Sequence, residues 1–356
     1  MHHELGAKMA EFAGYEMPIV YSSIKEEHMA VRENAGIFDV SHMGEFLVRG
    51  ADAPDFLQKI SSNDVLKLEI GQAQYSCIPN ESGGVVDDFL VYRLDEEEYM
   101  LVVNASNIEK DWNWISKYKP DDVHMADVSD SSGLLAVQGP KASEILQSLT
   151  DINLKEISFY HFKVGTFAGI EDVIISATGY TGSGGFELYV DNVYLIDLWE
   201  KIMEVGAPKG LVPAGLGARD TLRLEMGYCL YGNDITDETS PIEAGLGWIT
   251  KTKKGEFNSS KIFKKQRSEG VTRKLVGFKV EDRRVPRHDY EILNEKEEKI
   301  GFVTSGTLSP CLEEPIGMGY VEKEYATLGT SILINTGRKN LKATVTRTPF
   351  YLREEE

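Results

Sequence analysis

Short apolar runs and amphipathic stretches follow one another through the first 130 residues. Apolar runs at 45–49, 84–92 and 99–104 predict strands. Two capping boxes predict helix starts, because a hydroxyl side chain and a glutamate three residues later can satisfy N–H groups of the first turn. They are Ser23-Ile24-Lys25-Glu26, whose helix should stop at Gly36, and Ser106-Asn107-Ile108-Glu109. On the second helix, Ile108, Trp112 and Ile115 are spaced by four and three residues and share one face, so we expect them in the core.

The order of elements recurs in outline further along the chain. Strands are expected at 133–138, 172–178 and 186–190, and helices at 141–149, 193–205 and from about 216. This mixture predicts two α+β lobes. After about residue 270, short apolar runs separated by turns predict a small all-β barrel or sandwich. We therefore expect a bilobal region at 1–268, with lobes at roughly 1–130 and 131–268, and a β-domain at 269–356.

Composition and charge narrow the classes of partner. The 356 residues suit two or three domains, no apolar run is long enough to cross a membrane, and no secretory signal opens the chain. The formal net charge of −19 argues against nucleic-acid binding, which depends on neutralising phosphates. The cysteines are far apart and form no C-x-x-C pair, so we expect no metal and a cytoplasmic location; they are Cys77, Cys229 and Cys311.

One segment, 251–287, is rich in Lys and Arg although the chain as a whole is acidic. A solvated surface would explain its excess of cations, and so would a docking site for an acidic partner. The cations are Lys251, Lys253, Lys254, Lys261, Lys264, Lys265, Arg267, Arg273, Lys274, Lys279, Arg283, Arg284 and Arg287.

A glycine-rich turn at 179–185 separates two apolar runs and brings Tyr180 close to Glu187. Glycine permits a positive φ or a close approach of the backbone. A carboxylate can accept two parallel N–H bonds from an amidine-like edge, such as that of a pterin or a guanine. A hairpin with an exposed glutamate is the alternative. A phosphate-binding loop is disfavoured, since no Lys follows and the turn leads into a strand.

Two other segments carry candidate chemistry. Arg219 lies in the first turn of the helix expected from 216, where a structural salt bridge is the alternative. Asp87 and Asp88 are adjacent on a strand, so their side chains point to opposite faces. Only one of them can serve a given site, and Asp88 shares its face with Tyr92. His42 is a weak candidate for a general base, because a lone histidine near a strand start is more often simply hydrogen-bonded.

These motifs together resemble the aminomethyltransferase, or T-protein, family of the glycine cleavage system. They occur in the family's order over nearly the whole chain and are jointly specific. The segments are Phe38-Asp39-Val40-Ser41-His42-Met43-Gly44-Glu45, Gly83-Gly84-Val85-Val86-Asp87-Asp88, Gly179-Tyr180-Thr181-Gly182, Gly215-Leu216-Gly217-Ala218-Arg219-Asp220, Ser240-Pro241-Ile242-Glu243-Ala244-Gly245-Leu246 and Thr348-Pro349-Phe350-Tyr351.

The resemblance implies a fold and a reaction. The fold is an α+β, three-domain cloverleaf of two folate-binding lobes and a C-terminal antiparallel β-barrel. In the reaction, the aminomethyl group on the dihydrolipoyl arm of the H-protein partner gives its one-carbon unit to tetrahydrofolate, the co-substrate. The products are methylene-tetrahydrofolate, ammonia and the reduced arm.

The resemblance also implies roles for individual residues. The catalytic aspartate falls on Asp88, which would position the reacting folate nitrogen and assist proton movement. The pterin-binding carboxylate and guanidinium fall on Glu187 and Arg219. The lining positions fall on Met43, Tyr75, Tyr92, Asn104, Tyr180, Tyr228 and Tyr351. Ser183-Gly184 replaces the family's usual Glu-Asp, a change that would loosen the turn.

Two other functions remain open at this point. One is a tetrahydrofolate-dependent demethylase or methyltransferase on the same scaffold, which would act on a small methylated amine or sulfonium without a lipoyl partner. The other is a non-enzymatic folate-binding or RNA-modification accessory protein. Relatives of that kind carry a functional cysteine in a Lys-Gly-Cys-Tyr-type segment, from which Gly227-Tyr228-Cys229-Leu230 differs.

Overall fold

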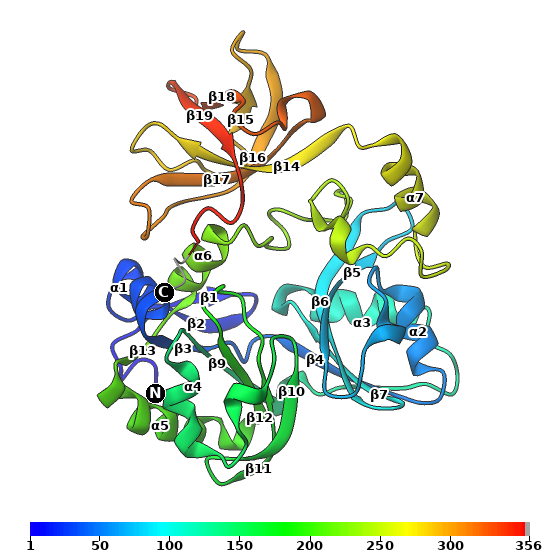
Figure 1. The fold of residues 1–356 in the computed structure, drawn as a ribbon, viewed down its shortest axis with the longest axis vertical. Helices are drawn as coiled ribbons and strands as arrows, with labels where there is room; N and C mark the ends of the chain where they lie inside the picture. The colour runs from blue at the N-terminus through cyan, green and yellow to red at the C-terminus, as the bar shows by residue number, and fades with distance from the viewer. Residues whose placement is uncertain (353–356) are drawn as a thin grey trace. The chain divides into compact units, whose positions relative to one another are not determined.

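The computed structural model describes residues 1–352, which divide into two compact units. Unit 1 comprises Met1–Ser76 and Asp87–Asp220, and unit 2 comprises Cys77–Val86 and the chain from Thr221 onward. Figure 1 gives the course of the chain through the elements of each unit. No helix of the described residues is long and apolar enough to cross a membrane.

The first sheet, most of which belongs to unit 1, has five strands in the order β5-β6-β7-β4-β8. Their bounds are β5 Ala73–Pro79, β6 Val85–Asp95, β7 Glu98–Val103, β4 Gly44–Arg49 and β8 His124–Asp127. One face carries buried apolar side chains, among them Phe46, whose ring meets that of Trp112 edge-on at 5.2 Å. Trp112 belongs to α3 (Ile108–Ser116), so α3 covers this face; α2 (Ala53–Ile60) follows β4 in the chain.

The second sheet of unit 1 has six strands in the order β10-β11-β12-β9-β3-β13. They are β10 Phe162–Phe167, β11 Ile170–Ser176, β12 Gly185–Asp191, β9 Ser132–Gln138, β3 Ala35–Asp39 and β13 Leu211–Pro213. β13 runs parallel to β3, and the other neighbouring strands of this sheet are antiparallel. β3 thus joins a sheet built mainly from the chain after residue 130.

The two faces of this six-stranded sheet differ sharply. Ile37, Leu135, Val137, Ile175 and Leu188 point to one side and form a core. The helices that contribute to this core are α4 (Ala142–Leu146) and α5 (Leu195–Gly206). The opposite face carries polar side chains, described below. Unit 1 also holds the hairpin β1–β2 (Lys8–Phe12, Tyr15–Val20), helix α1 (Ile24–Glu33) and the start of α6 (Leu216–Glu225).

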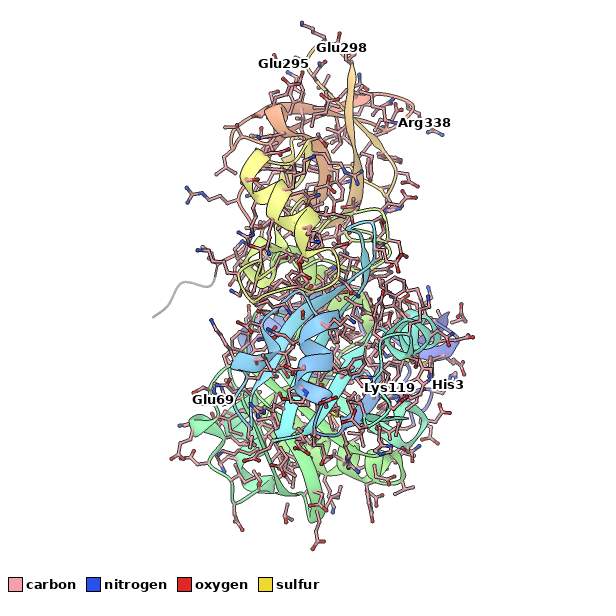
Figure 2. All side chains as sticks on the ribbon, turned by 90° about the vertical axis from the view of Figure 1, so that its right-hand side faces the viewer. His3, Glu69, Lys119, Glu295, Glu298 and Arg338 are labelled. Carbon is pink, nitrogen blue, oxygen red and sulfur yellow. The ribbon has the colours of Figure 1, made fainter. Side chains whose placement is uncertain are left out.

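Unit 2 contains a closed barrel of six strands in the order β14-β17-β16-β15-β18-β19, with all neighbours antiparallel. The strands are β14 Arg273–Val280, β15 Glu291–Leu293, β16 Lys299–Leu308, β17 Pro315–Glu322, β18 Ser331–Asn335 and β19 Asn340–Thr346. Aliphatic side chains and Phe278 fill the interior. The exposed side chains of Glu295, Glu298 and Arg338 project outward from its turns (Figure 2). The expected α+β fold with a C-terminal antiparallel barrel is confirmed.

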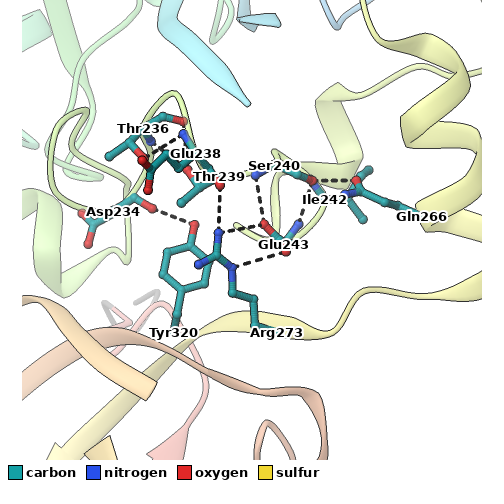
Figure 3. Close-up of polar contacts among 10 residues, drawn as sticks. All are labelled: Asp234, Thr236, Glu238, Thr239, Ser240, Ile242, Glu243, Gln266, Arg273 and Tyr320. Carbon is teal, nitrogen blue, oxygen red and sulfur yellow. Dashed lines mark hydrogen bonds and ion pairs between the residues drawn. The ribbon is translucent and has the colours of Figure 1, made fainter. Parts of the chain in front are cut away.

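A polar network joins the barrel to the segment before it, within unit 2 (Figure 3). Glu243 accepts from the backbone N–H of Ser240 at 3.1 Å and forms an ion pair with Arg273 at 3.3 Å. Tyr320 donates to the carbonyl of Asp234 at 2.8 Å, and the Arg273 guanidinium lies 5.0 Å from the centroid of the Tyr320 ring. The Ser240-Pro241-Ile242-Glu243 motif therefore fastens this segment to β14 and β17.

Three local expectations need correction. Helix α1 begins after the expected cap, Ser23, but ends at Glu33 because β3 already starts at Ala35 rather than beyond Gly36. Helix α3 has Asn107, not Ser106, as its N-cap, because residues 105–107 form a preceding 3₁₀ turn. Of its expected core residues, Ile115 is fully buried, whereas Ile108 and Trp112 are half-buried.

Candidate active site

Asp88 lies on β6 and is half-buried, with both carboxylate oxygens held by neighbouring side chains. Tyr75 of β5 donates its hydroxyl hydrogen to Oδ2 at 2.8 Å, and Asn104 donates from Nδ2 to Oδ1 at 2.9 Å. Asn104 follows directly after β7, the strand that pairs with β6. Three of the residues predicted for the site, Asp88, Tyr75 and Asn104, are thus brought together.

Asp87 points to the opposite face of β6, as the strand alternation predicts, and is fully buried. It accepts from the backbone N–H and the side-chain amide of Asn104, at 3.1 and 2.8 Å, and from Asn107 at 2.8 Å. Because the Asn104 amide also bonds Asp88, it connects the two adjacent carboxyl groups across the strand. The sequence did not predict Asn107 as a site residue.

Burial, followed by the charge of Asp87, raises the pKa of Asp88 to about 7. The hydrogen bonds from Tyr75 and Asn104 act in the other direction, because they favour the ionised carboxylate. A carboxyl group with a pKa near neutrality can accept a proton and return it under physiological conditions. Asp88 has the properties of a general acid–base group.

Tyr92 lies four residues beyond Asp88 on the same face of β6. Its hydroxyl group lies among polar side chains of the six-stranded sheet. Its hydroxyl oxygen lies 3.2 Å from Ser176 Oγ, 3.1 Å from Thr178 Oγ1 and 3.0 Å from Tyr189 Oη. Four residue steps along a strand span about 13 Å. The Asp88 face of β6 therefore reaches the second sheet at Tyr92, with Leu90 between the two polar side chains.

Glu187 lies on β12 opposite Ser176 and is buried beside this junction. Thr178 donates to its Oε2 at 2.5 Å. Burial raises the pKa of Glu187, while the Thr178 hydrogen bond and the charge of Arg219 lower it. The same hydroxyl group lies 3.1 Å from Tyr92 Oη. Thr178 consequently links the Glu187 carboxylate to β6, the strand that carries Asp88.

Arg219 stands on α6 with its guanidinium carbon 4.8 Å from the centroid of the Tyr180 ring, a cation–π contact. The start of α6 is held by Glu27 of α1, which accepts from the backbone N–H of Gly215 at 2.8 Å. A side chain on Gly215 would meet the carbonyl oxygen of Ile19 at 2.3 Å, so this close approach requires glycine. Burial lowers the pKa of Arg219, and the charge of Glu187 opposes this.

Two glycines of the glycine-rich turn, Gly179 and Gly185, lie against β9. A Cβ on Gly179, whose φ is +153°, would lie 2.0 Å from Oε1 of Gln138. Gln138 in turn donates to the carbonyl of Thr178 at 3.0 Å. Arg32 of α1 donates to the carbonyl of Thr181 at 2.5 Å and to Ser183 Oγ at 2.8 Å. The turn that presents Tyr180 is therefore pinned from two sides, although Ser183 replaces an acidic residue.

Gly83 and Gly84, just before β6, are a second place where the chain needs glycine. A Cβ on Gly84 would lie 1.7 Å from the carbonyl oxygen of Asp237, and Asn80 donates to that same oxygen at 2.8 Å. The close approach at Gly83-Gly84 is therefore made by the chain itself, within unit 2.

Met43 and His42 precede β4 at the edge of this region. Met43 is half-buried. His42 is 4% exposed, and burial, followed by the charge of Arg219, lowers its pKa to about 4. Its ring meets Phe12 edge-on at 5.5 Å. With so low a pKa, His42 is neutral at pH 7 and is a weak proton acceptor there.

Two of the predicted lining residues, Tyr228 and Tyr351, belong to unit 2. Both are half-buried. The Tyr228 carbonyl accepts from Arg223 at 3.0 Å, and Arg223 forms a fully buried ion pair with Asp234 at 2.7 Å. The backbone N–H of Tyr351 bonds the carbonyl of Glu225. The remaining predicted residues all lie in unit 1.

Sequence reasoning missed several polar residues around the site. Thr178, Gln138 and Arg32 connect elements that are far apart in the chain, and no local pattern marks them. Asp111 had a signal, since it lies three residues after Ile108 and four before Ile115 on the apolar stripe of α3. Glu45 shares the Asp88 face of the sheet, because it pairs with Val102, which pairs with Leu90.

Comparisons with known proteins agree with this architecture. Residues 1–254 match the family model of the GCVT N-terminal domain, and residues 273–351 match that of the glycine cleavage T-protein C-terminal barrel domain. An aminomethyltransferase of Porphyromonas gingivalis is 58% identical over 98% of this chain and 97% of its own length. One of Flavobacterium psychrophilum is 56% identical over 99% and 97%.

A solved structure gives the same result. The crystal structure of the glycine cleavage system aminomethyltransferase T from Bartonella henselae matches with a TM-score of 0.92 and 34% identity, over 98% of this chain and 96% of that one. These relatives confirm the expected function, a glycine cleavage aminomethyltransferase, and the expected enzyme class, a transferase. The chain therefore belongs to the glycine cleavage T-protein family.

Proposed function

We propose that Asp88 is the catalytic residue of this chain and that Glu187 and Arg219 bind the pterin of tetrahydrofolate. The aminomethyl donor would be the dihydrolipoyl arm of an H-protein, and the products methylene-tetrahydrofolate, ammonia and the reduced arm. The observation that carries the proposal is the half-buried Asp88 carboxyl group, with Tyr75 and Asn104 on its two oxygens and a pKa of about 7.

The charges of the site suit a reduced pteridine. Its pyrimidine edge presents adjacent N–H donors, which a carboxylate such as Glu187 accepts well. Arg219 offers N–H donors for the ring carbonyl, and the Tyr180 ring beneath it restrains its orientation.

Asp88 would act by position and by proton transfer. Tyr75 and Asn104 fix both oxygens, so the carboxylate can accept a hydrogen bond from the reacting folate nitrogen without first reorganising. A pKa of about 7 lets the same group take a proton from that nitrogen and release it as ammonia leaves. Met43, Tyr92 and Asn104 would line the ligand, and so would Tyr75 and Tyr180.

The test supplies aminomethylated H-protein and tetrahydrofolate and follows ammonia release. Asp88→Asn is expected to bind folate with little change and to lose turnover by about 10²–10⁴-fold, the usual contribution of a general acid–base group. Unchanged turnover would refute the assignment. Demethylation of a free methylamine or sulfonium, with no turnover of H-protein, would instead favour the demethylase alternative.

For the H-protein surface we propose the basic segment 251–287 of unit 2. Helix α7 (Ser260–Glu269) exposes Lys261, Lys264 and Lys265. Their neighbours Glu256 and Glu269 lie 3.9 and 3.8 Å from Lys261 and Lys265, surface pairs that restrain the lysines weakly. On a chain of net charge −19, such a segment would steer an acidic carrier protein toward it.

Charge reversal tests this surface. The double variant Lys264→Glu/Lys265→Glu is expected to slow association with H-protein about tenfold at low salt and less at high salt. The matched control, Lys296→Glu/Lys342→Glu, makes the same change of net charge at exposed positions of the barrel. Equal on-rates for the two variants would rule out steering by α7.

We also propose that the bilobal region ends near residue 268 and that the protein is located in the cytoplasm.

A further inference from the structure

Asp111 is a carboxyl group in an unusual place. It lies on α3, is fully buried and sits on the apolar stripe of the helix between Ile108 and Ile115. No hydrogen-bond donor from the described part of the chain reaches either of its oxygens. An ionised carboxylate without a donor is strongly disfavoured in a protein interior. The group must therefore be neutral or be satisfied in another way.

The neighbour that can satisfy it is Asp87. Asn107, the N-cap of α3 and one helical turn before Asp111, donates to Asp87 at 2.8 Å, which places this side of the helix against Asp87. Asp111 also interacts with Asp87, and both carboxyl groups are 0% exposed. Two carboxyl groups in this situation cannot both be ionised, so one of them holds a proton. Asp87 already accepts three hydrogen bonds from Asn104 and Asn107. Those donors stabilise a negative charge on Asp87, which leaves the proton to Asp111.

We propose that Asp111 is a neutral carboxylic acid that donates its hydrogen to the Asp87 carboxylate, and that this buried pair positions Asn104 and, through it, Asp88. The contacts then form one continuous path, from Asp111 to Asp87, through the Asn104 amide to Asp88 Oδ1, with Tyr75 closing the other oxygen. Asp111 is a positioning residue, because the path places it behind the sheet face that carries Asp88.

The electrostatics support this arrangement. Burial and the charge of Asp87 raise the pKa of Asp111 to about 11, and Asp88 adds to the effect. Lys110, the neighbouring cation on α3, opposes it. With the proton on Asp111, Asp87 keeps its negative charge, and that charge helps to raise the pKa of Asp88. The consequence for catalysis rests on the proposed role of Asp88; the protonation state of Asp111 does not.

Infrared difference spectroscopy tests the protonation state without any assay of turnover. The spectrum of wild type minus Asp111→Asn, recorded at pH 8, should show the carbonyl stretch of one protonated carboxylic acid. If this difference spectrum instead showed the band of one ionised carboxylate, Asp111 would be charged and the proposal would be overturned. Because Asn can donate from Nδ2 to Asp87, this variant should preserve the fold.

The pH profile of turnover tests the positioning role. Asp111→Leu removes one donor from Asp87, so the ionised form of Asp87 should become less favoured, and the acidic limb of the profile should move down by about one pH unit. Asp111→Asn should restore the wild-type limb. Ile115→Val, a buried substitution on the same helix, should lower stability without moving the limb. An unmoved limb in Asp111→Leu, or an equal shift in both Asp111 variants, would overturn the proposal.

Discussion

Neutralising Asp88 should stabilise the protein in a pH-dependent way. Asn is nearly isosteric with Asp, and the Tyr75 hydroxyl can either donate or accept, so Asp88→Asn can keep both contacts of the native side chain. The folded carboxyl group has a pKa of about 7 against an ordinary value of 3.8. Between these two values, the folded protein holds a proton at Asp88 that the unfolded chain has released.

The magnitude follows from that difference. Each unit of pKa shift corresponds to about 1.36 kcal/mol, so ionising Asp88 lowers the free energy of unfolding by at most about 4 kcal/mol at pH 8. At pH 5 the loss is less than half as large, because the folded group is still protonated. Solvent reaches part of the side chain, so the measured value should fall below this limit.

The assay is urea denaturation of wild type and Asp88→Asn between pH 5 and 8, followed by far-UV circular dichroism. The stability gained by the variant should grow as the pH rises toward 7 and then level off. Asp121→Asn, at an exposed position of unit 1, provides the control and should show no such trend. A constant difference between wild type and Asp88→Asn would refute the raised pKa, and with it the argument that Asp88 can exchange a proton near neutrality.

Two further predictions concern buried carboxylates of unit 1. Glu187→Gln keeps an acceptor for Thr178 but loses the charge, so tetrahydrofolate should bind about 10–100-fold more weakly in calorimetry, as expected for one charged hydrogen bond; unchanged affinity would remove Glu187 from the pterin site. Glu45 is 1% exposed. Its burial and the charge of Asp127 raise its pKa well above the ordinary value. Its ionisation should therefore weaken the fold as the pH rises, by up to about 1.4 kcal/mol per pH unit, and Glu45→Gln should remove that slope in urea denaturation; an identical slope in the variant would show that Glu45 ionises normally.

The sequence predicted the parts of the site that depend on local geometry. Strand alternation separated Asp88 from Asp87 and placed Tyr92 with Asp88, because the side-chain period of a strand is two residues. The capping box located the start of α1, and the turn-separated apolar runs after residue 270 indicated the barrel. In each case the information lies within a few neighbouring residues.

Contacts between distant segments were not predictable in the same way. Gln138 and Arg32 hold the 179–185 turn from β9 and α1, and nothing near them in sequence marks that role. The glycines of the 179–185 turn were associated with close approach, but only the structure shows that Gly179 makes room for Gln138. The close approach of Gly84 to Asp237 was likewise visible only in the structure. The carboxyl group of Asp111 on an apolar stripe was visible in the sequence. Its meaning depends on Asp87, which is 24 residues away in the chain.

The most direct test of the proposed site is the structure of the protein with a bound reduced folate. The pterin edge should lie against Glu187 and Arg219, with the reacting nitrogen within hydrogen-bonding distance of Asp88. A folate bound elsewhere, or one whose reacting nitrogen lies out of reach of Asp88, would contradict the proposed roles of all three side chains.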